Sequence, residues 1–125
     1  MAIMTLDHYT INTLDLDATI RFYVEVLGFE NGERPPFSFP GAWLYSGGKP
    51  VVHLVDGKAP EEAGSGTIDH VAFRAGGLGD FIRRFEDRGI PYSERDVPGA
   101  GIHQVFLSDP NGVTIEINFP GGEPP

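Results

Sequence analysis

An internal repeat constrains this chain more than any other feature of its sequence. The tripeptide LDH at residues 6–8 recurs as IDH at residues 68–70, an offset of 62 residues. Further along, residues 44–55 align without a gap with residues 107–118, at an offset of 63 residues. A duplicated sequence predicts two copies of one supersecondary unit, and a unit this small cannot bury both faces of its own sheet. The two copies are therefore expected to combine into one fold.

The first copy begins with a short apolar strand at residues 8–11 and continues into an amphipathic segment at residues 17–27. Apolar residues recur there at helical spacing, which predicts a helix. Asp15 or Asp17 is a suitable N-cap for this helix, and Gly28 is a suitable C-terminal stop.

The second copy has the same order, with a strand at 70–73 and a helix at 80–88 that ends at Gly89. In both copies the aligned stretches 44–55 and 107–118 read as strand, tight turn, strand. Between helix and hairpin, each copy holds a Gly- and Pro-rich segment that favours one more strand, at 30–39 and 92–100. Each copy is therefore predicted to be a βαβββ module.

The length of 125 residues suits one domain, residues 1–125, with a single core. The repeat sets its modules at about 3–57 and 66–119, and residues 120–125 are expected to be a flexible tail. Apolar residues make up 40% and charged residues 22% of the chain, which is ordinary for a globular protein.

Composition argues against several classes of partner. The net charge is −9 and the nine basic residues are scattered, so the chain offers no basic stripe for nucleic acid. No apolar run is long enough to span a membrane. Cysteine is absent, and the N-terminal MAIMTLDH lacks the features of a signal peptide, so we expect a cytoplasmic protein.

Four ionisable residues occupy matched positions of the two copies. His8 is equivalent to His70, and His53 is equivalent to Glu116. All four lie in apolar, strand-like runs, where an ionisable side chain needs an explanation. If a pseudo-twofold axis relates the modules, the four side chains converge on it. Their nitrogen and oxygen donors suit one divalent ion, Zn²⁺, Ni²⁺, Mn²⁺ or Fe²⁺, with positions left for water or substrate.

The sequence resembles the vicinal oxygen chelate superfamily, which includes glyoxalase I, fosfomycin-resistance thiol transferases, extradiol dioxygenases, methylmalonyl-CoA epimerase and bleomycin-binding proteins. The resemblance extends from Leu6 to Phe119 and is most specific at residues 6–8, 20–29, 69–73 and 109–116. It implies an α+β fold in which two βαβββ modules form a cup-shaped mixed sheet with helices outside. It also implies a homodimer, whose metal sites lie within one chain or are shared between subunits.

Residue by residue, the resemblance gives His8, His70 and Glu116 as metal ligands and places His53 in the fourth ligand position. Glu116 is in addition the candidate catalytic base, because a weakly held carboxylate can leave the metal and move a proton. Glyoxalase I enzymes of this length usually carry Glu at the position of His53. They also carry an Arg for the glutathione carboxylate where this chain has Asn12, so both residues depart from the glyoxalase I pattern.

His103 is a second candidate for acid or base chemistry. If Pro110 and Asn111 are the turn corners of the last hairpin, Val105 lies opposite Glu116, and His103 shares the face of that carboxylate. The alternative is that His103 lies at a loop edge and contacts solvent.

The segment 34–45 is rich in aromatic residues and proline, and its rings either line an apolar substrate pocket or belong to the core or a dimer interface. The candidate substrate-binding residues are Asn12, Phe37, Phe39, Trp43 and Arg74. An apolar pocket favours an aromatic or otherwise hydrophobic substrate.

Three functions fit these observations. The leading one is a metal-dependent lyase or isomerase of glyoxalase type, acting on a small molecule that chelates the ion through neighbouring oxygens. The second is a ring-cleaving extradiol dioxygenase that uses Fe²⁺. The third is a metal-free protein that binds a small molecule or drug, although the four ligand-type residues argue against it.

Overall fold

The computed structural model describes residues 6–57, 70–97 and 101–121. The chain divides into two compact units, Met1–Pro60 and Glu61–Pro125. Among the residues described, no helix is both long and apolar enough to cross a membrane.

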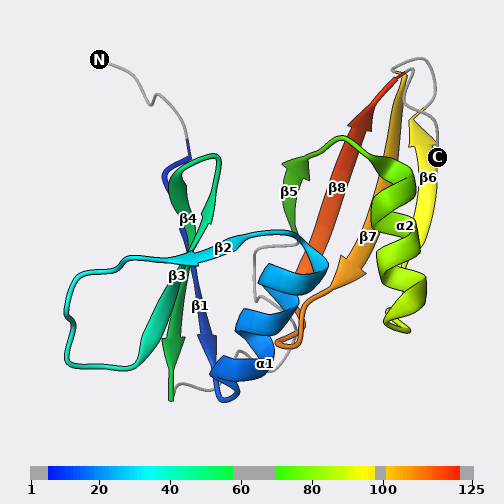
Figure 1. Cartoon of the computed structure of the whole chain (residues 1–125). Coiled ribbons are helices and arrows are strands. Elements are labelled where there is room, and N and C mark those ends of the chain that lie inside the picture. The colour runs from blue at the N-terminus through cyan, green and yellow to red at the C-terminus, as the bar shows by residue number, and fades with distance from the viewer. Residues whose placement is uncertain (1–5, 58–69, 98–100, 122–125) are drawn as a thin grey trace, which may run out of the picture. The chain divides into compact units, whose positions relative to one another are not determined.

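The first unit contains one mixed sheet and one helical segment (Figure 1). Its elements are β1 (Tyr9–Thr13), α1 (Leu16–Arg21), η1 (Phe22–Val26), β2 (Glu30–Gly32), β3 (Gly41–Ser46) and β4 (Lys49–Asp56). The strand order is β1-β4-β3-β2, in which β1 pairs with β4 in parallel and the other neighbours are antiparallel.

The helical segment of the first unit has two parts where the sequence predicts one helix. Asp15 caps α1, because its side chain accepts a hydrogen bond of 3.0 Å from the backbone N–H of Ala18. The next turn, η1, is a π-helix, closed by a bond of 3.2 Å from Leu27 N–H to the carbonyl of Phe22. Residues of this wider turn pack inward, and the helical segment ends at Gly28, whose φ is 86°.

Strand alternation gives the first sheet one buried face. Leu44, Val52 and Leu54 are almost fully buried there, together with Tyr23 from the helical segment. Residues that alternate with them, such as Trp43 and His53, lie on the face opposite the helix and are half-buried.

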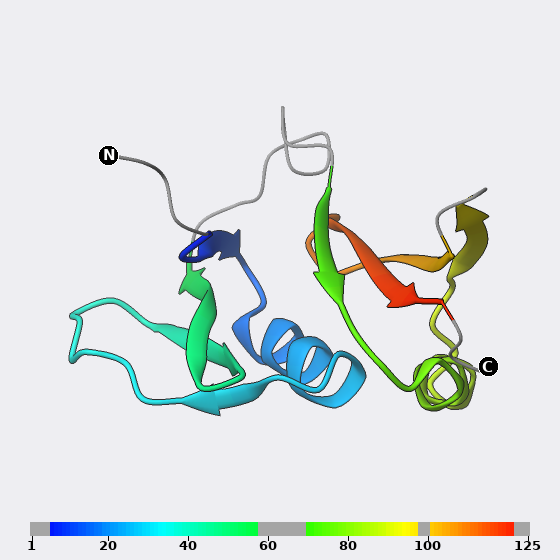
Figure 2. The same ribbon diagram turned by 90° about the horizontal axis from the view of Figure 1, so that it is seen from above.

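The second unit repeats this architecture. Its elements are β5 (Val71–Arg74), α2 (Leu78–Asp87), β6 (Ser93–Val97), β7 (Ile102–Ser108) and β8 (Thr114–Pro120), in the sheet order β5-β8-β7-β6. Helix α2, seen nearly end-on in Figure 2, packs on one face of the sheet, with the rings of Phe81 and Phe119 5.6 Å apart and Phe85 fully buried. It begins two residues before the predicted start.

The strand registers show the repeat directly. His53 is paired with Thr10 of β1 and Trp43 of β3. Glu116 is paired with Ala72 of β5 and Phe106 of β7, at the offsets found in the sequence. The predicted fold class, two βαβββ modules with mixed sheets, is therefore confirmed.

Candidate metal centre

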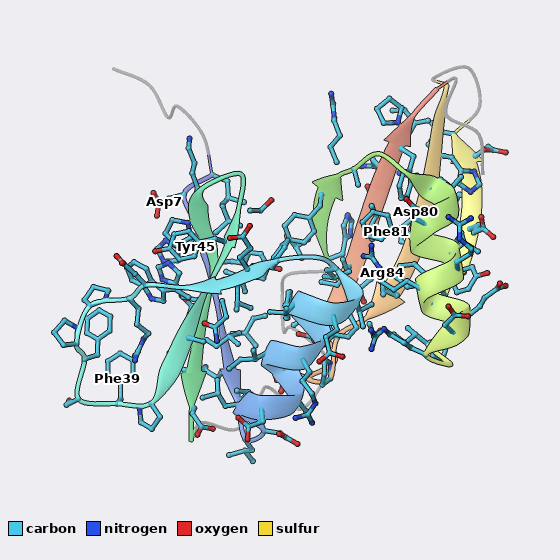
Figure 3. The ribbon with its side chains drawn as sticks, in the orientation of Figure 1. Asp7, Phe39, Tyr45, Asp80, Phe81 and Arg84 are labelled. Carbon is cyan, nitrogen blue, oxygen red and sulfur yellow. The ribbon has the colours of Figure 1, made fainter. Side chains whose placement is uncertain are left out.

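His8 and His53 lie together in the first unit. Their rings are stacked, with centroids 3.8 Å apart and planes 13° from parallel. His8 Nδ1 lies 2.5 Å from Oδ2 of Asp7, which is labelled in Figure 3. Since a carboxylate accepts, the neutral tautomer that fits this contact carries its proton on Nδ1 and its lone pair on Nε2. The carbonyl of Pro50, 3.0 Å from Nε2 of His53, likewise leaves the lone pair of His53 on Nδ1.

Burial and the neighbouring His8 together favour a neutral His53. Burial lowers the pKa of His53 from its ordinary value, and the neighbouring His8 lowers it further. The hydrogen bond with His8 lowers the pKa of Asp7, which stays an acceptor for that ring. A neutral imidazole whose other nitrogen is held by an acceptor is the form that binds a metal.

His70 and Glu116 form the corresponding pair in the second unit. His70 Nε2 lies 3.3 Å from Oε1 of Glu116. The other carboxylate oxygen, Oε2, accepts hydrogen bonds from the Nδ2 group of Asn118 at 2.8 Å and from the Nε2 group of Gln104 at 3.2 Å. Gln104 is not among the site residues predicted from the sequence. The signal that could have identified it is its place as a polar residue inside an apolar strand.

Three imidazoles and one carboxylate are a donor set that suits a divalent transition metal. The second unit fits this role well, because neighbouring amides already orient the carboxylate. In the first unit, the stacked rings would have to rotate apart before both could bind one ion, since each lone pair lies in its own ring plane. In the described parts of the chain, no group of three or more His, Asp or Glu residues is already arranged so that it could hold a metal ion.

The structure corrects the predicted position of His103. Phe106, not Val105, lies opposite Glu116, so Gln104 and Phe106 share the face of the carboxylate and His103 lies on the helix side. The turn of the hairpin is longer than the two corner residues assumed from the sequence, and this changes the register by one residue. A role for His103 beside Glu116 is therefore not supported by its position.

Aromatic rings continue outward from the histidine pair. Centroid distances are 4.1 Å for Trp43 and His53, 6.2 Å for Phe37 and Trp43, and 5.0 Å for Phe37 and Phe39. We call His8, His53, Trp43, Phe37 and Phe39 the ring row. Phe37 and Phe39 are 43% and 42% exposed, so the core alternative is wrong for these two.

The other predicted substrate contacts are Asn12 and Arg74, which lie on the same sheet faces as His53 and Glu116, respectively. Asn12 is exposed and pairs with Val55, two residues beyond His53 in β4. Arg74 is exposed and pairs with Asn118, two residues beyond Glu116 in β8. Their role in binding a substrate stays a prediction.

Known proteins share this sequence pattern and this fold. A family model described as the Glyoxalase/Bleomycin resistance protein/Dioxygenase superfamily matches residues 5–117. The chain belongs to this superfamily. The resemblance found in the sequence is therefore confirmed.

The proteins that resemble this chain differ in what their names describe. "Glyoxylase I 4" of Arabidopsis thaliana is 33% identical over 121 residues, which cover 90% of this chain and 69% of the plant protein. A variant of the fosfomycin resistance protein FosX from Listeria monocytogenes, complexed with Mn(II) and a dihydroxypropylphosphonic acid, is 19% identical with a TM-score of 0.78. That alignment covers 97% of this chain and 95% of FosX.

A second solved structure that resembles this chain is TnmS3, an antibiotic-binding protein from a Streptomyces species. It is 24% identical with a TM-score of 0.76, and the alignment covers 97% of this chain and 99% of TnmS3. The superfamily fold thus occurs in proteins named as enzymes and in proteins named as binders. Whether this chain is an enzyme or a binding protein therefore has to be argued from its own residues.

Proposed function

We propose that this protein is a divalent-metal-dependent lyase or isomerase of glyoxalase type, acting on a small molecule that chelates the ion through neighbouring oxygens. His8, His70 and Glu116 hold the ion, and His53 is the fourth candidate ligand. The observation that carries the proposal is the pair of His70 Nε2 and Glu116 Oε1 at 3.3 Å, with the second carboxylate oxygen held by two amides.

A bound divalent ion would polarise substrate oxygens and stabilise an oxyanion or enediolate. The residues of this chain supply the rest. Asp7 orients His8 so that Nε2 keeps its lone pair, and Asn118 and Gln104 orient Glu116. Glu116 has two predicted roles, ligand and base, which compete for the same carboxylate.

The relatives support a metal-dependent reaction. The plant relative at 33% identity carries the name of a glyoxalase I, and the FosX variant binds Mn(II) together with a phosphonate. Neither name fixes a substrate for this chain. His53 and Asn12 both depart from the glyoxalase I pattern, so we propose the reaction class and not the glutathione substrate.

Metal content tests the proposal directly. We would purify the wild-type protein anaerobically and measure bound metal in it and in His8→Ala, Glu116→Ala and, as a matched histidine control, His103→Ala. We expect stoichiometric metal in the wild type and the control, and loss of about tenfold or more in affinity in the other two. Unchanged metal content in both ligand variants would contradict the proposal.

The identity of the metal separates the two enzyme classes. Tightly held Zn²⁺ or Ni²⁺ would contradict the extradiol dioxygenase alternative, whereas Fe²⁺ would favour it over the lyase.

The ring row favours a second candidate function, a metal-free protein that binds a small aromatic molecule. Two exposed, stacked phenylalanine rings continue to Trp43 and the histidine pair, which offers a planar molecule a surface for stacking. A wild-type protein that binds no divalent metal would make this candidate the better one.

A further inference from the structure

The polar network around Glu116 has only one possible orientation. Arg95 Nε can only donate, so its bond of 2.9 Å to Gln104 fixes Oε1 of the Gln104 amide on that side. The Nε2 group of Gln104 must then face Asn118 and Glu116, and it donates to Asn118 Oδ1 at 3.0 Å. This leaves Nδ2 of Asn118 to donate to Glu116.

In this orientation the amide groups of Gln104 and Asn118 both donate to the same atom, Oε2 of Glu116. That oxygen accepts two hydrogen bonds from amides in neighbouring positions, and Gln104 is only 8% exposed. Moving the carboxylate would break both bonds and take an acceptor away from the amides of the buried Gln104 and the half-buried Asn118, which opposes the movement. Oε1, on the side of His70, is the oxygen that these amides do not hold.

The equivalent position in the first module shows that the network is specific to the carboxylate. Strand pairing matches Gln104 and Asn118 in the second unit with Gly41 and Val55 in the first. No side chain fits at Gly41, because a Cβ there would lie 2.2 Å from the carbonyl oxygen of Leu54. The module that carries a histidine at the ligand position has no counterpart of the amide pair.

We propose that Gln104, together with Asn118, is a positioning residue that makes Glu116 a fixed one-oxygen ligand through Oε1 and prevents it from acting as a mobile base. The inference rests on the proposed metal function and deepens it. It assigns one of the two competing roles to Glu116. It also predicts that loss of the amide changes how the carboxylate binds metal, in addition to how tightly.

The test compares Gln104→Met with the wild type and with Tyr92→Phe. Met keeps the length of the side chain and removes its hydrogen bonds. Tyr92→Phe removes one hydrogen bond, to Glu86, elsewhere in the same unit. Affinity for Co²⁺ is measured by competition with a chelator, and far-ultraviolet circular dichroism checks the fold. We expect about a tenfold or greater loss of affinity in Gln104→Met and none in Tyr92→Phe.

The visible spectrum of bound Co²⁺ gives a readout that a purely structural role would not change. With one of its two hydrogen bonds removed, Oε2 is held less firmly and both carboxylate oxygens can bind, and a higher coordination number weakens the d–d absorption. We expect this weakening in Gln104→Met and in Asn118→Leu, since each removes one of the two bonds to Oε2, and the second variant keeps the test valid if the first does not fold. Co²⁺ affinity and spectrum both equal to wild type in the folded variants would overturn the inference.

Glu116→Ala separates this failure from failure of the proposed function. If Glu116→Ala loses Co²⁺ while Gln104→Met and Asn118→Leu match the wild type, the metal site stands and the positioning role is wrong. If Glu116→Ala also binds Co²⁺ as the wild type does, the proposed function and the positioning role are both wrong.

Discussion

His103 lies between two carboxylates on the helix side of the second sheet. Its Nδ1 is 2.7 Å from Oδ1 of Asp96, and its Nε2 is 2.8 Å from Oε1 of Glu94. A neutral imidazole has one N–H, so only the doubly protonated ring can donate both bonds. Hydrogen bonds to Asp96 and then to Glu94 accordingly raise the pKa of His103 above its ordinary value.

We predict that this cluster stabilises the protein at low pH and loses its effect as the pH rises. Because the pKa of His103 is higher in the folded chain, the stabilisation is complete below the unfolded pKa and disappears as the pH passes the folded pKa. The measurement is the difference in the free energy of unfolding between the wild type and His103→Gln, from about pH 5 to about pH 9. Solvent screening limits this difference to under about 1 kcal/mol.

A difference that stays constant over this pH range would contradict the charge argument. Asp87→Asn, which removes a carboxylate at the end of α2, is the control for a general change in surface charge. Its pH profile should follow that of the wild type around the titration of His103.

Strands β3 and β4 together place the ring row on the face opposite the helix. Trp43 and His53 are direct partners across the two strands, and their planes are 9° from parallel. The segment before β3 adds the exposed rings of Phe37 and Phe39, with the guanidinium of Arg34 5.1 Å and 5.3 Å from the two ring centres. Figure 3 labels Phe39 beside the part of this segment that leads into β3.

The ring row predicts a preference for aromatic ligands. Trp43 is the one tryptophan of the chain, so quenching of its fluorescence reports binding at this place. We expect 2,3-dihydroxynaphthalene to quench Trp43 and cyclohexane-1,2-diol, its non-aromatic match, to have little effect. Phe37→Ala should weaken the aromatic ligand by about twofold to tenfold, the effect of one aromatic contact.

The exposed Leu14, which lies outside the ring row, provides the control. Leu14→Ala should bind the naphthalene diol as the wild type does. Equal affinity for the two diols, or an unchanged affinity in Phe37→Ala, would show that the ring row does not select the ligand.

At the scale of the whole molecule, the candidate ligands are divided equally. One pair belongs to the first unit and the other to the second, and each unit buries one face of its sheet with its own helix. Each module therefore has its own core but only half of the proposed ligand set. We propose a homodimer in which each ion takes ligands from two chains.

Mixing two defective variants tests this assembly. His8→Ala and Glu116→Ala each lose one ligand, and a mixed dimer with shared sites regains one complete site from the two intact residues. After the chains are exchanged by unfolding and refolding together, we expect metal binding at about a quarter of all sites, because half of the dimers are mixed. A monomeric protein by light scattering, or a mixture that binds no metal, would show that each site lies within one chain.

The sequence alone determined the repeat, the βαβββ order, the fold class and which polar residues of one strand share a face. These follow from strand alternation and helical spacing, which are local properties of the chain. Predictions from the sequence were wrong where the position of a residue depends on distant parts of the chain. The helical spacing did not predict the π-turn at 22–26, and the face of His103 depends on the number of residues in a turn.

The tertiary structure alone decided how the candidate ligands are held. Gln104 carries no motif, and its importance comes from strand pairing that places its amide beside Glu116 and Arg95. The stacking of His53 between His8 and Trp43 likewise depends on three separate segments. A sequence shows which donors a chain possesses, but the direction of each donor follows from its neighbours across the sheet, because hydrogen bonds are directional.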